Sequence, residues 1–300
     1  MPSVTLKIDQ NILDKMHDFY KEDIEEVNHD YILWKTKTID DVVITIYSSK
    51  KGLKALFSGE NALNEAKIWN LDAEFNVPKE KPNFTWKYLG SQIGSDEVGT
   101  GDFFGPVIVV AAYVDQDIIP YLRELKVNDS KKLTDQKILE IVPEFLDKVT
   151  FSKLTCTNEK YNKLVANGYS MNKIKAILHN HALLKVREKI NKDEECFVDQ
   201  FSDVDLYYSY IQNEPKILNK KITFETKGES KYPSIAVASM IARYSFLKEM
   251  EVLESKYAME LPKGASTTVD EAAQKFKNKF GRDELMKICK ANFKNLEKIK

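Results

Sequence analysis

The stretch from Ile93 to Val114 constrains the fold of this chain more than any other. It contains the adjacent acids Asp96 and Glu97, then passes through three glycines and a proline, and ends in the apolar run Val107–Val114. A run of this length is too short to cross a bilayer and suits a buried strand. The stretch therefore predicts a strand, an acidic turn and a second strand, with both acids where the first strand ends.

The glycines of this stretch exclude two common phosphate-binding loops. Gly99, Gly101 and Gly105 have the spacing G-x-G-x-x-x-G, whereas the dinucleotide fingerprint needs G-x-G-x-x-G. A P-loop would also need a Gly-Lys-Ser or Gly-Lys-Thr sequence, and none follows these glycines. We therefore expect the loop to approach a ligand other than a free nucleotide.

Two adjacent carboxylates in a loop are usually solvated, or they cap the next element. The position of Asp96 and Glu97 favours another interpretation, because Val98-Gly99 supplies a turn that lets both side chains reach one place. Like charges held together are costly unless they share a cation. The pair is therefore a candidate metal or catalytic site.

A longer pattern around these acids resembles a known family. Asp-Glu-Val-Gly-Thr-Gly-Asp-Phe-Phe-Gly-Pro from Asp96, an apolar strand, and then Asn-Asp-Ser-Lys-Lys-Leu from Asn128 resemble bacterial ribonuclease HIII, of the type 2 ribonuclease H superfamily. Ribonuclease HII typically has Gly-Arg-Gly where this chain has Gly99-Thr100-Gly101, and this difference favours type HIII. The resemblance implies hydrolysis of the RNA strand of RNA/DNA hybrids by a ribonuclease-H-like α/β domain, a mixed sheet flanked by helices.

The resemblance also implies a metal site. Its acids are Asp96, Glu97, Asp199 and Glu229, which would hold two Mg²⁺ or Mn²⁺ ions and leave 5′-phosphate and 3′-hydroxyl ends. Glu229 stands where the family often has Asp. Asp199 also ends the apolar run Cys196–Val198, as expected of an acid at the end of a buried strand. Asp203 and Asp205 are rivals in a more polar stretch.

Substrate contacts are expected in two segments beside these acids. Gly99, Thr100 and Gly101 can bring backbone groups and a hydroxyl to the ribose 2′-hydroxyls that distinguish RNA from DNA. Ser130 and Lys131 resemble the family's contacts to the strand near the scissile phosphate. Three weaker candidates lie on a helix predicted from about Ser170 to Ile190: Asn172, Lys175 and Asn180.

The pattern of elements predicts two domains joined by a linker. Residues 1–76 have the order β-α-β-β-β-α, with strands at Val4–Ile8, Tyr31–Thr36, Val42–Ser48 and Leu53–Phe57 and helices after Asp9 and from Asn61 to Trp69. Residues 77–89 carry the prolines and charges of a linker. Residues 90–300 form the catalytic domain.

Family resemblance implies that the N-terminal domain folds like half of the TATA-binding protein and binds the hybrid. Its sheet can present lysines beside aromatic rings, namely Lys35, Lys37, Lys50, Lys51 and Lys54 with Tyr47 and Phe57. Residues 1–90 contain 12 lysines and 15 acidic residues, so a basic surface there must be local. Lys256–Lys300 has 11 basic and 6 acidic residues, which suits either phosphate binding or a solvated helical tail.

The cysteines and the N-terminal sequence indicate the redox state and the cellular location to expect. Cys156, Cys196 and Cys289 are far apart and odd in number, which predicts reduced, mostly buried thiols. The N-terminus shows no targeting pattern, so we expect a cytoplasmic protein without membrane contact, monomeric and without an obligate protein partner. His179-Asn180-His181 reads as a polar helix turn rather than a nuclease motif.

Two alternative functions stay open at this point. One is incision at a single ribonucleotide in duplex DNA, as in ribonuclease HII. The other is a non-catalytic protein that binds hybrids, with the acids in structural roles only.

Overall fold

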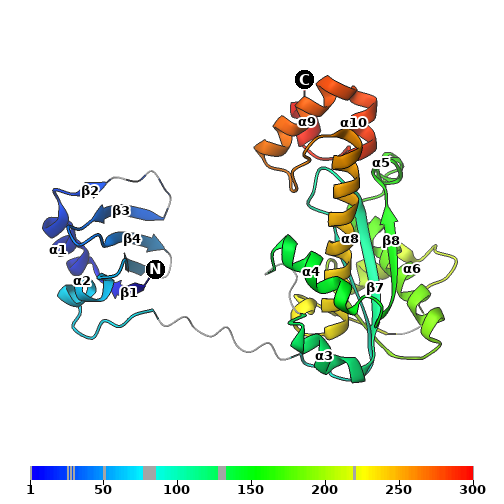
Figure 1. Ribbon diagram of the computed structural model, residues 1–300, viewed down its shortest axis with the longest axis horizontal. Coiled ribbons are helices and arrows are strands. Elements are labelled where there is room, and N and C mark those ends of the chain that lie inside the picture. The colour runs from blue at the N-terminus through cyan, green and yellow to red at the C-terminus, as the bar shows by residue number, and fades with distance from the viewer. Residues whose placement is uncertain are drawn as a thin grey trace. The chain divides into compact units, whose positions relative to one another are not determined.

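The computed structural model describes residues 2–299 apart from 26, 28, 30, 50–51, 77–85, 128–132 and 219–220. The chain divides into two compact units, Met1–Asn83 and Phe84–Lys300, shown in Figure 1. Each unit contains a five-stranded sheet. The predicted substrate residues Ser130 and Lys131, and Lys50 and Lys51 of the predicted basic surface, lie outside the described residues.

The first unit is an antiparallel sheet of strand order β1-β5-β4-β3-β2 with two helices. Its elements are β1 (Ser3–Ile8), α1 (Gln10–Tyr20), β2 (Ile24–Glu25), β3 (Ile32–Lys37), β4 (Val43–Ser49), β5 (Gly52–Ser58) and α2 (Ala62–Trp69). Asp9 caps α1, because its carboxylate accepts a hydrogen bond from the Ile12 amide at 2.8 Å. The sequence did not predict β2, which is too short to show a strand's alternation.

Alternation along the strands separates a covered face of this sheet from an open one. Ile44, Ile46 and Phe57 belong to the buried core that also contains residues of α1 and α2. Tyr47 and Lys54 alternate with these residues, so they lie on the opposite face. The prediction that Phe57 stands beside the lysines is therefore wrong, because its ring is fully buried on the helix side.

The second unit is a mixed α/β structure of strand order β10-β9-β6-β7-β8. β6 pairs antiparallel with β7 but parallel with β9, and this mixed sheet confirms the predicted fold class. Its elements are β6 (Gln92–Val98), β7 (Val107–Val114), η1 (Gln116–Ile118), α3 (Ile119–Glu124), α4 (Asp135–Phe145), β8 (Thr150–Cys156), α5 (Asn158–Ala166), α6 (Met171–Ile190), β9 (Glu195–Asp199), α7 (Val204–Ile211), β10 (Ile222–Glu225), η3 (Gly228–Ser230), α8 (Pro233–Tyr257), α9 (Thr267–Phe280), α10 (Arg282–Ile288) and α11 (Asn295–Lys298).

Strand β7 explains the uninterrupted apolar run of the sequence. Ile108, Val110 and Ala112 pack in one core with residues of α8, whereas Val109 and Ala111 pack in another with residues of α6. The strand is buried on both faces, so no position along it favours a polar side chain. Figure 1 shows α8 lying beside β7, with α9 and α10 near the C-terminal end of α8.

The three cysteines are free and buried, as predicted. No helix among the described residues combines the length and the apolar character needed to cross a membrane.

Candidate active site

Asp96 and Glu97 lie within strand β6, not in a turn after it. The pairing of β6 with β7 continues through Asp96↔Val110 and Glu97↔Val109 to Val98↔Ile108. The strand thus continues one residue past the acids and ends at Val98, and the charges of the two acids interact there. As consecutive strand residues, their side chains leave the sheet on opposite faces, Asp96 toward α8 and Glu97 toward α6.

Asp96 is almost completely buried, with 4% of its surface exposed. Its carboxylate accepts a hydrogen bond from the Glu97 amide at 2.7 Å and another from Ser239 of α8. Burial raises the pKa of Asp96 well above its usual value, and the negative charges of Glu97 and Asp199 raise it further. Three acids are therefore close enough to repel one another.

The parallel register of β6 and β9 brings Asp199 to this place. Ser95 pairs with Val198, so the next position along each strand sets Asp199 level with Asp96. Oδ1 of Asp199 accepts a hydrogen bond from the Gly228 amide at 2.8 Å, which ties β9 to the turn that holds Glu229. The rival acids Asp203 and Asp205 are exposed at the start of α7.

Glu229 lies in the short helix η3, directly before α8. It is only 2% exposed although it is a carboxylate, and a side chain on the neighbouring Gly228 would collide with Ile235 of α8. This packing fixes the turn close to β9. The structure thus gathers Asp96 and Asp199 at the ends of parallel strands, with the turn of Glu229 bonded to Asp199.

Two side chains of α6 hold Glu97. Lys175 Nζ donates to Glu97 Oε1 at 2.9 Å, and His179 Nε2 lies 3.0 Å from Glu97 Oε2. Burial alone would raise the pKa of Glu97, but His179 and Lys175 outweigh it and lower the pKa to about 2. The pKa values of the adjacent acids are therefore shifted in opposite directions, since Asp96 is close to other acids, whereas Glu97 is hydrogen-bonded by Lys175 and His179.

His179 was not predicted as a site residue, and the interpretation of its helix turn as merely polar is wrong. The imidazole is fully buried, with Nδ1 2.7 Å from Ser95 Oγ and the ring stacked on Phe201 at a centroid distance of 5.0 Å. The available signal was the spacing of Lys175 and His179, because residues i and i+4 share one face of a helix. Of the weaker substrate candidates, Asn180 is buried and bonds Lys216 O and Leu218 N, so it holds the 216–218 segment instead.

The loop Gly99–Gly105 follows directly after the acids. Gly99 has φ +84°, and a Cβ there would lie 2.1 Å from Pro106 O, so the protein itself requires glycine at this position. Gly101 differs, because a Cβ there would meet no atom within 4 Å. Gly101 is exposed and Thr100 is partly exposed, which leaves this part of the loop open to a ligand.

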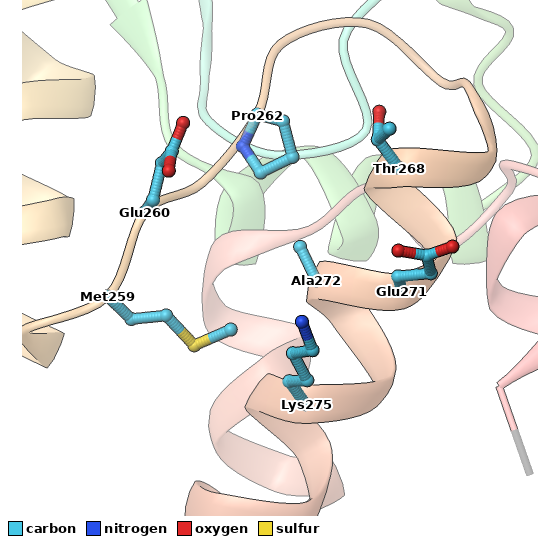
Figure 2. A pocket seen from close by; sticks show the side chains of 7 residues that line it. All are labelled: Met259, Glu260, Pro262, Thr268, Glu271, Ala272 and Lys275. Carbon is cyan, nitrogen blue, oxygen red and sulfur yellow. The ribbon is translucent and has the colours of Figure 1, made fainter.

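The structure also contains a cavity of about 340 Å³ away from the acids. It lies between the Met259–Pro262 segment and α9 and is lined by Glu260, Thr268, Glu271 and Lys275 among others, as Figure 2 shows. None of the four predicted metal-binding acids lines it. We therefore do not assign the chemistry to this cavity.

Comparison with known proteins agrees with this fold. The model of the family described as ribonuclease HII matches residues 93–296, and a domain of unknown function, DUF3378, matches residues 3–82. The fold and the family model thus define an enzyme of the ribonuclease H class. Ribonuclease HIII of Bacillus licheniformis is 38% identical over an alignment 312 positions long, which covers 100% of this chain and 98% of that protein. The chain belongs to the ribonuclease HIII family.

Solved structures give the same result. The structure described as Bst-RNase HIII in complex with Mn²⁺ is 37% identical, with a TM-score of 0.69 over 99% of this chain and 97% of the other. RNase H3 of Aquifex aeolicus, at 24% identity and a TM-score of 0.56 over 96% of this chain and 99% of its own, shares the fold.

Proposed function

We propose that this enzyme hydrolyses the RNA strand of RNA/DNA hybrids with the help of divalent metal ions. The observation that carries the proposal is the position of Asp96, buried and flanked by the charges of Glu97 and Asp199. Such a concentration of negative charge is unfavourable in the protein alone and becomes favourable once a divalent cation neutralises it. Relatives named ribonuclease HIII, one of them solved with Mn²⁺, support the same proposal.

The donor set fits Mg²⁺ or Mn²⁺, because both ions prefer oxygen ligands such as carboxylates. In the described part of the chain, no three or more histidine, cysteine, aspartate or glutamate side chains are grouped closely enough to hold a metal ion as they stand. The proposed ligands are Asp96, Glu97, Asp199 and Glu229. A bound pair of ions would activate a water and stabilise the leaving 3′-oxygen, giving 5′-phosphate and 3′-hydroxyl ends.

Glu97 can serve this site while it keeps its partners on α6. Each carboxylate oxygen has two lone pairs, so Oε1 and Oε2 can accept from Lys175 and His179 and still face a cation. The two hydrogen bonds restrict the rotation of the carboxylate, which orients it before a metal binds. Lys175 and His179 therefore act as positioning residues in the proposed mechanism.

Recognition of the RNA strand is proposed for the open part of the Gly99–Gly105 loop. Gly101 leaves free space and Thr100 offers a hydroxyl, both directly after the acids. Ribose 2′-hydroxyls both donate and accept hydrogen bonds, so backbone amides and carbonyls of this loop can read them. Ser130 and Lys131 complete the proposed substrate site.

We also propose that residues 1–76 bind the hybrid, that 77–89 link the units and that 90–300 carry out catalysis. The open face of the first sheet brings Tyr47, Lys54 and Lys7 into one cross-strand row, because Tyr47 pairs with Lys54 and Lys54 with Lys7. Two cations followed by an aromatic ring suit a nucleic-acid backbone and its bases.

The proposal is tested by cleavage of four end-labelled duplexes: all-RNA, all-DNA, RNA/DNA hybrid, and DNA with one ribonucleotide. We expect cutting mainly in the RNA strand of the hybrid, dependent on Mg²⁺ or Mn²⁺, abolished by chelator and by Asp96→Asn. Efficient cutting only at the single ribonucleotide would move the assignment to ribonuclease HII activity. Hybrid binding without cleavage by folded protein would leave the non-catalytic alternative.

A further inference from the structure

The Gly99–Gly105 loop is held in place by a segment distant in sequence. Gly264 makes two contacts with it: its amide donates to Asp102 Oδ1 at 2.6 Å, and its carbonyl accepts from the Phe103 amide at 2.9 Å. Further along, Ile288 O accepts from the Gly105 amide at 2.9 Å. The end of the loop next to β7 is therefore attached to the C-terminal part of the chain.

Lys290 adds a buried cation to this attachment. Its side chain is fully buried, and Nζ donates to Asp102 O at 2.7 Å and to Gly105 O at 2.6 Å. The Lys290 amide also donates to Phe103 O at 2.9 Å. One ammonium thus joins the two ends of the Asp102–Gly105 turn through backbone carbonyls, while Asn158 donates to Gly105 O at 2.8 Å.

A buried ammonium is unusual because removing its charge from water costs free energy. Burial lowers the pKa of Lys290 to about 8, while the charge of Asp102 counteracts this effect. An apolar residue of similar length would fill the space without that cost but would leave the two carbonyls with fewer donors. The packing of the core therefore does not account for a lysine here, whereas the shape of the loop does.

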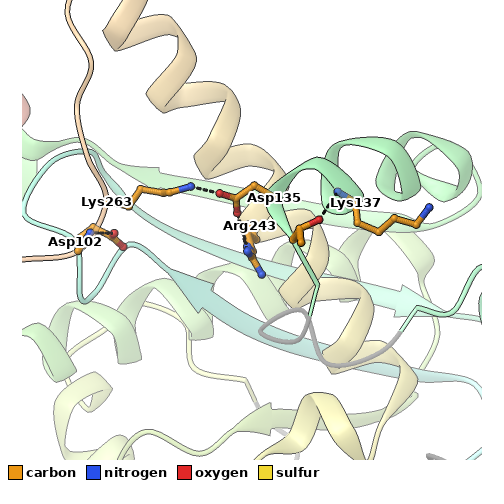
Figure 3. A network of polar contacts seen from close by, with 7 residues as sticks. Asp102, Asp135, Lys137, Arg243 and Lys263 are labelled. Atoms are coloured by element: carbon orange, nitrogen blue, oxygen red, sulfur yellow. Dashed lines mark hydrogen bonds and ion pairs between the residues drawn. The ribbon is translucent and has the colours of Figure 1, made fainter. Parts of the chain in front are cut away.

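The same C-terminal segment reaches the helix that follows Ser130 and Lys131. Lys263, the neighbour of Gly264, bonds the carboxylate of Asp135 at the start of α4, and Arg243 of α8 bonds the same carboxylate at 3.1 Å, as Figure 3 shows. The consecutive residues Lys263 and Gly264 thus contact Asp135 and Asp102, respectively. This segment thus connects the loop after β6 with the start of α4.

We propose that Lys290, together with Gly264, is a positioning element that sets the conformation of the Gly99–Gly105 loop for the ribose hydroxyls of the RNA strand. This inference rests on the proposed function, because the loop's ligand is the hybrid. Lys290 touches no reacting atom in this role. Lys290 fixes the Asp102–Gly105 turn, and this turn holds Thr100 and Gly101 at a constant distance from Asp96.

The test compares Lys290→Met with Lys294→Met in the full-length enzyme. Lys294 is an exposed lysine four positions away, so its replacement removes the same charge from the same segment. We expect Lys290→Met to raise KM for the hybrid about tenfold with a smaller change in kcat, and Lys294→Met to leave both nearly unchanged. Lys290→Ala should regain a lower KM when propylammonium is added, because the cation can enter the space left by the side chain.

Hydrogen exchange provides a second readout at the loop itself. Amides of residues 99–105 should exchange faster in Lys290→Met than in the wild type, while those of β7 keep their protection. An unchanged KM, or a loss of active protein without any change in KM, would overturn the inference. Where Lys290→Met does not fold, Asp102→Ala removes the bond to Gly264 without leaving a cavity beside β7, and an unchanged KM for that variant has the same consequence.

Cleavage of the hybrid by the wild-type enzyme distinguishes a failure of this inference from a failure of the proposed function. If the wild-type enzyme does not cut the hybrid, the proposed function fails. If it cuts the hybrid and Lys290→Met cuts equally well at low substrate concentration, only the role of Lys290 fails.

Discussion

His179 Nε2 on α6 lies 3.0 Å from Glu97 Oε2 on β6, and the opposite ring nitrogen lies 2.7 Å from Ser95 Oγ. The imidazole thus joins two alternate residues of the strand that carries the acids. Because it is fully buried, its ring cannot turn to solvent. The orientation of the Glu97 carboxylate depends on this contact.

Replacement of His179 by Ala should lower activity by about 10- to 100-fold, the range known for residues that orient metal ligands. The reason is that Glu97 loses one of its two partners on α6 and its carboxylate becomes free to rotate. Cleavage of the hybrid as a function of Mn²⁺ concentration measures the effect, which should include a higher half-saturating concentration. His181→Ala is the matched control, since His181 is 41% exposed and pairs with Glu214. Equal activity of the two variants would contradict the role of His179.

Asp96→Asn should stabilise the protein in chelator at neutral pH, although it removes activity. The folded-state pKa of Asp96 is raised, so the group contributes its full stability below the unfolded value near 3.8 and loses it as the pH rises through the folded value. Asparagine does not ionise, so the variant does not lose this stability as the pH rises. We expect its Tm to exceed the wild-type value by roughly 3 to 6 °C near pH 8 and by less at lower pH.

Glu97→Gln should shift the Tm in the opposite direction in the same assay. The folded-state pKa of Glu97 is lowered to about 2, so its stabilising effect is present above the unfolded value of 4.5 and disappears as the pH falls toward 2. Its replacement leaves Lys175 buried without a carboxylate and should lower Tm at neutral pH. If both variants shifted Tm in the same direction, the assignment of the two acids to different environments would be wrong.

Gly101→Ala should reduce cleavage of the hybrid while leaving stability within about 0.5 kcal/mol of the wild type. A Cβ at this position has no neighbour within 4 Å, so any effect must come from the substrate. Gly94→Ala is the contrasting variant, because its Cβ would lie 2.4 Å from Ile235 N on α8. We expect Gly94→Ala to destabilise the protein by about 3 kcal/mol or more, since the helix cannot move without losing its packing on β6. Denaturant unfolding and steady-state cleavage distinguish the two outcomes.

Double replacement of Lys7 and Lys54 by Ala should weaken hybrid binding and reduce its dependence on salt. If each lysine contacts one phosphate, the slope of log K against log salt should become shallower by roughly 1.5 to 2. Binding is measured by anisotropy at several salt concentrations, in the Asp96→Asn background. Lys15→Ala with Lys67→Ala, on helices α1 and α2, is the control pair. An equal loss for both pairs would show that the open face of the sheet has no special role.

Much of the local structure was predictable because it depends on neighbours in the chain. Alternating apolar residues placed strands β3, β4 and β5 to within about two residues. Asp9 and Ser170 marked the starts of α1 and α6, since a side-chain oxygen before a helix satisfies its free amides. The mixed sheet followed from the order of these elements.

The surroundings of the candidate site were less predictable. Asp96 and Glu97 were expected at a turn, but the pairing of β6 with β7 continues past them, so that Asp96 contacts α8 and Glu97 contacts α6. Phe57 was expected on a basic surface and lies in the core instead. Each error concerns which face a residue occupies, and a shift of one residue in the end of a strand reverses that assignment.

The sequence by itself determined most strands of the first unit and the burial of β7, because periodicity and apolar runs act over a few residues. Only the tertiary structure decided that Glu97 is held by Lys175 and His179, and that Lys290 closes the loop after Gly99. Those contacts join residues about 80 and 185 positions apart, between Glu97 and α6 and between Gly105 and Lys290. Such distances in sequence are bridged only when the sheet and its helices pack, so no local pattern reports them.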